Sequence, residues 1–409
     1  MTESPLETLV LDGTTRIVLL VLDGIGDLPD PAHSGRTPLE AARTPHLDAL
    51  TPRAALGRLV PVAPGITPGS GPGHLALFGY DPVTTRVGRG VLEALGAGME
   101  LRDGDVAARA NFCTVDGAGI VTDRRAGRIP GETCARLVAM LAREASRIED
   151  VEVLLKSGKG HRFVAVLRGP GLSGSVSDAD PHREGSAIPA AAPLGHGSQA
   201  PPAAIKSARV VNAFIRRAAE RLRGEPAANA VLLRGLSARP ALPGYLERFR
   251  LRAAAIAAYP MYRGVAQLAG MEVFPVGERV SEAFTAVAER WSDFDFFFIH
   301  VKGADMAGED GDFAAKVAVI EEVDRALPEL LALSPDVLCV TGDHSTPVPM
   351  RGHSWHPVPA LVHARWCGAD AAPRFHEASC RAGSLGMLPS RDLMALLLAN
   401  AGRLDKFGA

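Results

Sequence analysis

Residues 17–23 read IVLLVLD, residues 296–305 read FFFIHVKGAD, and residues 337–344 read VLCVTGDH. Each is a short apolar run that ends in polar residues, which is the pattern of a parallel strand buried on both faces. In open α/β sheets, ligands bind just beyond the carboxyl ends of such strands. The side chains at these strand ends are Asp23, Asp305, Asp343 and His344. The sequence therefore predicts one sheet with acids and a histidine at one edge, a donor set that divalent cations use.

The composition indicates a folded, nearly neutral protein. Of its 409 residues 47% are hydrophobic, and 44 basic and 46 acidic residues give a net charge of −2. This balance lacks the basic excess typical of nucleic-acid binding. The five cysteines form no CxxC pair, which favours reduced thiols in a cytoplasmic protein. We find neither a signal sequence nor an apolar run near the ~20 residues of a spanning helix, so we expect no membrane partner. The oligomeric state stays open.

The order of strand and helix patterns predicts two domains. Strands alternate with helices over residues 1–98 and again over 246–409, whereas residues 99–245 hold short strands separated by turns. The simplest architecture is an α/β sheet domain built from both chain ends, with an α+β domain inserted between them. Residues 183–207 are rich in Pro, Ala and Gly, and this composition predicts a long loop or a lid.

Ser70 is a candidate nucleophile in the segment GSGPGH, residues 69–74. The flanking glycines free the backbone to expose its hydroxyl. A serine reacts poorly unless a base or a metal lowers its pKa, and no triad motif surrounds this one, so we favour activation by a metal. A plain Ser/Gly turn is the alternative. A dinucleotide-binding loop fits less well, because the spacing is not GxGxxG.

Further ligand candidates follow the second and third strands. Asp343 and His344 are adjacent, and HSWH at residues 353–356 could add an imidazole from either histidine. Asp305 and Glu309 are spaced i, i+4, so one helical turn could direct both toward one cation. The alternatives are a helix N-cap beside a surface histidine and an acid-rich helix N-terminus, which the helix dipole favours.

The middle of the chain carries basic clusters that indicate anion binding. Three arginines fall within DRRAGR at residues 123–128, and GKGHR at residues 158–162 follows. The planar guanidinium group suits both phosphate and carboxylate. A solvated surface is the alternative. The candidates are Arg124, Arg125, Arg128, His161, Arg162 and Arg234.

Together these segments resemble the cofactor-independent phosphoglycerate mutases of archaeal type, in the alkaline phosphatase superfamily. The resemblance covers nearly the whole chain and rests, in order, on VLDGIGD, GHLALFGYDP, GRGVLEALGAG, DRRAGR, GKGHRF, SDADPH, KGADMAGEDGDF, TGDHSTP and HSWHPVP. It implies an alkaline-phosphatase-like sheet domain that holds two divalent ions, and an inserted substrate-binding domain. It also implies a serine that takes the phosphoryl group of 3-phosphoglycerate and returns it to the other hydroxyl, which gives 2-phosphoglycerate.

The resemblance also implies roles for individual residues. By position, one metal site comprises Asp23, Ser70, Asp343 and His344, and the other comprises Asp305, Glu309 and His353. The metals would be Mn²⁺, Mg²⁺ or Zn²⁺. The expected substrate-binding residues are Arg124, Arg125, Arg128, His161, Arg162, Asp178, Arg234 and Arg263.

The chain departs from the family pattern at two places. Glu309 stands where the family normally has a histidine, and residues 71–73 are Gly-Pro-Gly where it usually has an acid. A carboxylate adds negative charge and a hard oxygen, which shifts preference toward Mn²⁺ or Mg²⁺ over Zn²⁺. Two other functions remain open. One is a metal-dependent phosphatase or phosphotransferase acting on another small phosphorylated or phosphonylated acid, and the other is a binding protein that has lost one metal.

Overall fold

The computed structural model describes residues 5–85, 87–195 and 200–408, and the chain divides into two compact units. Unit 1 combines Met1–Arg86 with Leu242–Ala409, and unit 2 is Val87–Ala241. The sequence places the first boundary after residue 98. In the structure it lies earlier because helix α5 (Arg89–Gly96) packs on strands of unit 2.

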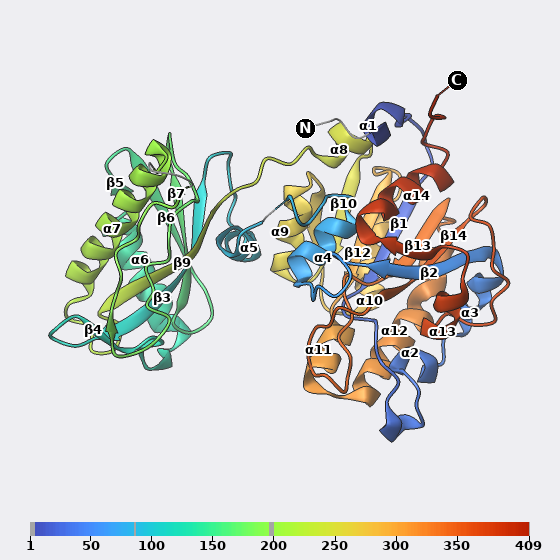
Figure 1. Ribbon diagram of the computed structural model, residues 1–409, viewed down its shortest axis with the longest axis horizontal. Helices are drawn as coiled ribbons and strands as arrows, with labels where there is room; N and C mark the ends of the chain where they lie inside the picture. The colour runs from blue at the N-terminus through green and yellow to red at the C-terminus, as the bar shows by residue number, and fades with distance from the viewer. Residues whose placement is uncertain (1–4, 86, 196–199, 409) are drawn as a thin grey trace. The chain divides into compact units, whose positions relative to one another are not determined.

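Within the described residues, unit 1 is built around an eight-stranded mixed sheet (Figure 1). In sheet order the strands are β11 (Glu272–Pro275), β10 (Ala253–Ala257), β12 (Phe296–Val301), β1 (Ile17–Leu22), β13 (Val337–Thr341), β14 (Val358–Ala364), β2 (Ala54–Val60) and β15 (Gly386–Pro389). Only β14 runs against the others. The three apolar runs are therefore the neighbouring strands β12, β1 and β13, and their carboxyl ends meet at one edge.

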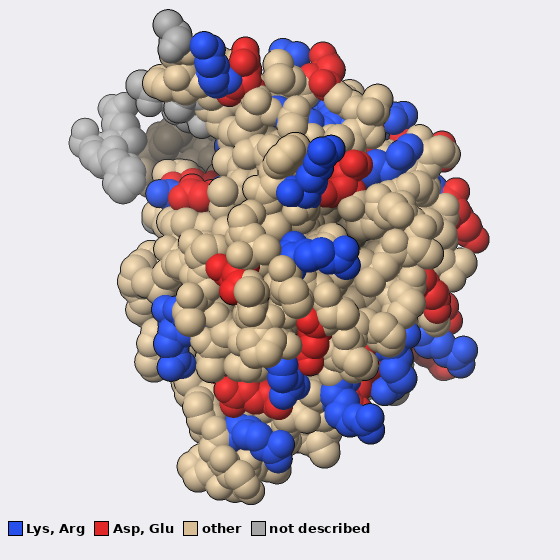
Figure 2. Space-filling view, turned by 90° about the vertical axis from the view of Figure 1, so that its right-hand side faces the viewer, with Lys and Arg blue, Asp and Glu red and all other residues tan. Residues whose placement is uncertain are grey.

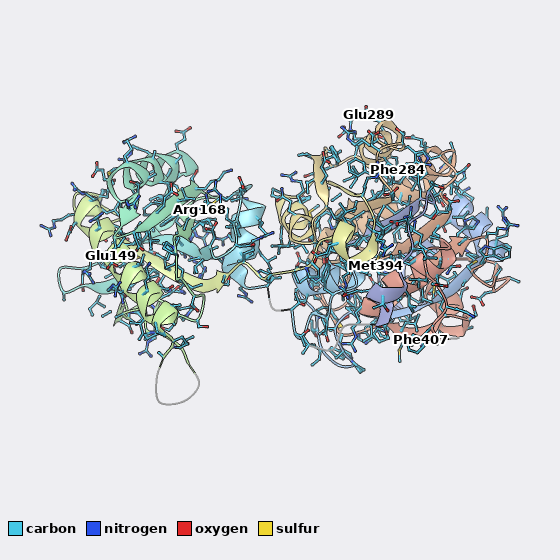
Figure 3. The ribbon with its side chains drawn as sticks, turned by 90° about the horizontal axis from the view of Figure 1, so that it is seen from above. Glu149, Arg168, Phe284, Glu289, Met394 and Phe407 are labelled. Atoms are coloured by element: carbon cyan, nitrogen blue, oxygen red, sulfur yellow. The ribbon has the colours of Figure 1, made fainter. Side chains whose placement is uncertain are left out.

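Helices cover both faces of this sheet, which explains why its central strands are apolar throughout. One face packs against α2 (Pro38–Ala41), α3 (Pro45–Leu50), α10 (Val280–Glu289), α12 (Phe313–Leu331) and α13 (Glu377–Ala382). The other face packs against α4 (Ser70–Leu77), α8 (Tyr245–Phe249), α9 (Pro260–Leu268) and α14 (Leu393–Asn400). In Figure 3, Phe284 marks the core of the first layer and Met394, buried against Gly79, marks the second.

Unit 2 holds a separate antiparallel sheet that two long helices cover (Figure 1). Its strands are β3 (Val106–Val115), β4 (Ile120–Asp123), β5 (Arg147–Ile148), β6 (Val151–Ser157), β7 (Arg162–Arg168), β8 (Ser186–Ala187) and β9 (Ala230–Ala238). The helices α6 (Gly131–Glu144) and α7 (Pro202–Leu222) pack on β6 and β9. Arg168, labelled in Figure 3, ends β7 and pairs with the buried Asp105 at 2.7 Å. The predicted fold class, an α/β sheet domain from both chain ends with an inserted α+β domain, is confirmed.

The remaining elements are short. They are α1 (Pro5–Leu9), α11 (Gly303–Asp310) and the 3-10 helices η1 (Pro31–His33), η2 (Thr51–Arg53), η3 (Ala126–Arg128) and η4 (Ser390–Asp392). The loop expected over residues 183–207 is shorter in the structure, because α7 already begins at Pro202; within that range residues 196–199 lie outside the described part.

The surface agrees with the balanced composition. On the face drawn in Figure 2, Lys and Arg alternate with Asp and Glu rather than forming a patch of one sign. Among the described residues, no helix is long and apolar enough to cross a membrane.

Candidate active site

The ends of β1 and β13 bring a first group of buried ligand atoms together. His344 Nε2 lies 3.2 Å from Asp23 Oδ1 and 3.2 Å from Asp343 Oδ2. All three side chains are buried, and their ligand atoms lie within 4.8 Å of one another. This spacing suits a single cation held by two carboxylates and one imidazole.

A second group shares His344 with the first. Asp305 comes from α11, directly after β12, and His353 follows from the loop after β13. Asp305 Oδ1 lies 3.4 Å from His353 Nε2 and 3.9 Å from His344 Nε2, and the two imidazole rings stack with centroids 3.7 Å apart. His344 Nε2 has one lone pair and can bind only one cation. A second candidate position beside the first, at the carboxyl edge of the sheet, would therefore depend on Asp305 and His353.

Ser70 lies at this edge as the first residue of α4. Its Oγ is 3.4 Å from His344 Nε2. The glycine-rich sequence allows this approach, because a Cβ at Gly73 would come within 2.4 Å of the Asp343 carbonyl oxygen. A helix N-terminus favours negative charge, so the hydroxyl occupies a position suited to a phosphoryl group.

Three further basic side chains surround the acids. Lys302 Nζ lies 3.2 Å from Asp23 Oδ2 and also contacts the Asp305 carboxylate. His300 Nε2 lies 3.0 Å from Asp23 Oδ2, and His74 Nδ1 lies 3.2 Å from Asp343 Oδ2 and 2.8 Å from the Ser70 carbonyl oxygen. The sequence reasoning missed all three as site residues. A histidine inside a continuous apolar strand was the available signal for His300.

These contacts set the charge of the acids. Burial raises the pKa of Asp23, but His300 and His344 lower it well below its usual value. Burial also raises the pKa of Asp305, whereas the hydrogen bond to His353 and the charge of Lys302 bring it down. Burial lowers the pKa of His353, but Asp305 and the Pro68 carbonyl raise it to about 9. The acids are therefore ionised and His353 carries a proton near neutral pH.

Two buried oxygens of the first group fit a bound cation. Within the described part of the chain, Asp23 Oδ1 and Asp343 Oδ2 are buried, and the imidazole nitrogens 3.2 Å from them do not have hydrogen-bonding geometry. A buried carboxylate oxygen without a partner is costly, and a metal ion is one of the groups that offset the cost. The donor set and these oxygens therefore fit divalent cations.

Two residues expected near the metals lie at the margin. The Glu309 side chain is 54% exposed, and its Oε1 lies 3.8 Å from His353 Nε2. His356 Nδ1 contacts Ser354 Oγ at 3.0 Å. Among the described residues, neither ligand group includes Glu309 or His356.

The basic residues expected to bind substrate form a cluster in unit 2. Arg124 makes a bidentate contact with Asp180, at 3.1 and 2.7 Å, and Arg234 lies 3.7 Å from the same carboxylate. Burial, followed by the charge of Arg109, lowers the pKa of Arg234, whereas the charge of Asp180 raises it. Asp178 accepts hydrogen bonds from the Gly235 amide and from His182. The cluster thus holds the positive charges of Arg124 and Arg234 against the Asp180 carboxylate.

The rest of the predicted set divides between the units. In unit 2, burial and the charges of Arg162, Arg125 and Arg128 lower the pKa of His161, so these four side chains are neighbours. Arg263 belongs instead to α9 of unit 1, where it donates to the Ala258 carbonyl oxygen at 2.6 Å.

Fold and site together define a class: an α/β enzyme in which a serine hydroxyl lies beside carboxylates and imidazoles suited to divalent cations. The family model for 2,3-bisphosphoglycerate-independent phosphoglycerate mutase matches residues 52–228. A probable mutase of this kind from Thermotoga neapolitana is 53% identical over 401 residues, covering 98% of both chains. One from Thermus thermophilus is 51% identical over 399 residues, covering 97% of this chain and 96% of the relative. The chain belongs to this family, whose members are isomerases.

Solved structures agree with the assignment. A cofactor-independent phosphoglycerate mutase from Thermoplasma acidophilum has a TM-score of 0.79 and 32% identity, covering 95% of this chain and all (100%) of that one. A protein from Pyrococcus horikoshii has a TM-score of 0.78 and 30% identity, covering 97% and 100%.

Proposed function

We propose that this enzyme interconverts 3-phosphoglycerate and 2-phosphoglycerate through a phosphorylated Ser70, with two divalent cations at the paired ligand groups. One observation carries the proposal: the two groups meet at His344, and Ser70 Oγ lies 3.4 Å from the Nε2 of that same residue. A hydroxyl beside two cation positions is an arrangement that promotes in-line phosphoryl transfer.

Each group has a defined role in the proposed reaction. The cations, when bound, would lower the pKa of the attacking hydroxyl and screen the charge of the phosphoryl group. Ser70 Oγ forms a bond to phosphorus while the bond to the glycerate oxygen breaks, and that oxygen takes up a proton in place of the one that Ser70 gives up. His74 holds the Ser70 backbone through its carbonyl, at 2.8 Å. Return of the phosphoryl group to the other glycerate hydroxyl completes the isomerisation.

Unit 2 would bind the carboxylate of the glycerate. Its cluster of Arg124, Arg125, Arg128, Arg162 and Arg234 offers planar donors that match a carboxylate. We assign Asp178 and His161 of unit 2, and Arg263 of unit 1, to glycerate binding by their positions in the sequence. A mutase must also keep water from the phosphoserine, because hydrolysis would release phosphate instead of returning it.

The test is to incubate Mn²⁺-loaded enzyme with 3-phosphoglycerate and follow 2-phosphoglycerate and inorganic phosphate by NMR. Acid-quenched samples should contain a peptide with one phosphoryl group on Ser70. Ser70→Ala should lose both the product and the modified peptide, whereas Ser292→Ala, an exposed serine of unit 1, should keep both. Release of phosphate without 2-phosphoglycerate would identify a phosphatase instead. Normal turnover in Ser70→Ala would overturn the proposal.

A further inference from the structure

Lys316 is a fully buried lysine of α12 that takes no part in the proposed chemistry. Its side chain is 0% exposed, and so is that of its ion-pair partner Asp27. Nζ lies 2.8 Å from Asp27 Oδ2, 2.8 Å from the Gly24 carbonyl oxygen and 2.9 Å from the Thr346 carbonyl oxygen. The Gly26 carbonyl oxygen is a fourth acceptor, at 3.3 Å. An ammonium group has three protons, so these four acceptors use all of its donors.

The acceptors belong to the two loops that hold the first ligand group. Gly24 directly follows Asp23, and Thr346 lies two residues after His344. Asp27 adds a second link between the same two loops, because its carboxylate also accepts a hydrogen bond from the Val348 amide at 3.1 Å. Thr346 Oγ1 in turn donates to Asp305 Oδ1 at 2.6 Å. One ammonium group therefore fixes the loop after β1 against the loop after β13.

Stability alone does not account for this pair. Removing two charges from water costs several kcal/mol per ion, and well-packed apolar residues in place of a buried ion pair are often as stable. Buried polar groups can instead specify one arrangement of the chain around them. Here that arrangement is the relative position of the loops that carry Asp23, Asp343 and His344.

We propose that Lys316, paired with Asp27, is a positioning residue that holds the loops after β1 and β13 in the register that divalent cations and phosphoryl transfer require. The claim that Lys316 supports cation binding rests on the proposed function. The claim that Lys316 fixes the two loops does not, because its hydrogen bonds exist without a bound ion.

The test compares two variants. Lys316→Met with Asp27→Leu removes both charges together, so neither ion is left buried alone. Arg403→Met is the matched control. Arg403 is also a buried cation, 1% exposed, and it donates to the Gly13 and Thr15 carbonyl oxygens at 2.8 Å near the opposite end of β1. Circular dichroism checks folding, hydrogen exchange reports the loops without metal, and calorimetry with Mn²⁺ reports cation affinity.

In the double variant we expect amide exchange at residues 344–348 to be at least tenfold faster and the Mn²⁺ dissociation constant to be at least tenfold larger. The kcat should fall and the KM for 3-phosphoglycerate should stay within about twofold, because the basic cluster of unit 2 is unchanged. Arg403→Met should lower only the unfolding temperature.

Wild-type loop protection and wild-type Mn²⁺ affinity in the folded double variant would overturn the inference. If it does not fold, Asp27→Asn keeps the shape of the side chain and removes its negative charge and one of its two acceptor oxygens. It should shift both readouts in the same direction, and no shift would again overturn the inference. If the wild-type protein binds none of Mn²⁺, Mg²⁺ and Zn²⁺, the proposed function fails, and the exchange experiment still decides whether Lys316 fixes the loops.

Discussion

Binding of a cation to the second ligand group should depend steeply on pH, because the cation must displace a proton from His353. His353 Nδ1 donates to the Pro68 carbonyl oxygen at 3.0 Å, and Nε2 faces Asp305 Oδ1 at 3.4 Å. Burial lowers the pKa of the ring, but the contacts with Asp305 and Pro68 raise it to about 9. At neutral pH the ligand nitrogen therefore carries a proton.

The size of the effect follows from this pKa. Each pH unit below about 9 reduces the deprotonated fraction tenfold, so the dissociation constant should rise about 100-fold between about pH 8.5 and about pH 6.5, or ~2.7 kcal/mol. The folding stability of the metal-free protein should change with pH in the opposite direction to the cation affinity. The pKa of His353 is raised above its unfolded value of about 6.5, so its stabilising contribution is complete below that pH and is lost as the pH rises through about 9.

Calorimetric titration with Mg²⁺ at three pH values in this range measures the effect. Two buffers with different ionisation enthalpies should show about one proton released per second cation near neutral pH. His353→Gln should bind the second cation weakly and without this proton release, whereas His356→Gln should behave as the wild type does. A wild-type dissociation constant that changes less than threefold across the range would refute the reasoning.

Three other predictions concern separate parts of the chain. Glu309→His replaces a carboxylate 3.8 Å from His353 with an imidazole. The affinity for Zn²⁺ should therefore rise at least tenfold in a competition assay. An unchanged affinity together with an unchanged or lower mutase rate would contradict this prediction. Burial raises the pKa of Glu377 to about 7. The folded protein therefore keeps this proton to a higher pH than the unfolded chain does. The free energy of unfolding should then fall as the pH rises from about 4.5 to about 7. Glu377→Gln should remove that slope and stabilise the protein by ~3 kcal/mol near pH 8 in urea unfolding; a slope equal to that of the wild type would count against it. Phe163→Ala removes a ring 4.7 Å from that of Phe112 in the core of unit 2, at a cost of ~3–5 kcal/mol. Calorimetry should then show one unfolding transition shifted and Mn²⁺ binding unchanged, whereas a joint shift of all transitions would argue against separate units.

The sequence predicts the sheet and its polar edge because both depend on local patterns. A strand buried on both faces must be apolar along its length, so IVLLVL, FFFIHV and VLCVT are visible without a structure. The residue after such a strand then lies at the carboxyl edge, which places Asp23 and Asp343. The edge strands β11 and β15 are not predicted because they are short, at four residues each, and none of their residues is buried.

Lys316 and His74 could not be predicted from local patterns, because their roles depend on contacts with distant segments. A lysine in the first turn of a helix is normally expected in solvent, and nothing in FAAKVAV indicates that α12 turns this side chain toward residues 24–27. His74 lies inside the quoted motif GSGPGH, yet its contact with Asp343 requires α4 to approach the loop after β13. Within this motif, Gly73 is the residue that indicates a close contact, because a side chain there would collide with the Asp343 carbonyl oxygen.

The charges at the site give a physical reason to expect metal loading and proton release together. In the metal-free protein, Lys302 and the protonated His353 oppose the charges of Asp23, Asp305 and Asp343, with Glu309 at the margin. Two divalent cations would bring four positive charges against these four carboxylates. The proton on His353 must then leave, both because the cation needs the nitrogen and because its charge is no longer balanced. Lys302 remains as a positive charge beside Asp23 and Asp305, and under the proposed function it would attract a phosphoryl group to the site. A histidine at position 309 would add one further net positive charge, so substitution there tests the balance of charge as well as the choice of metal.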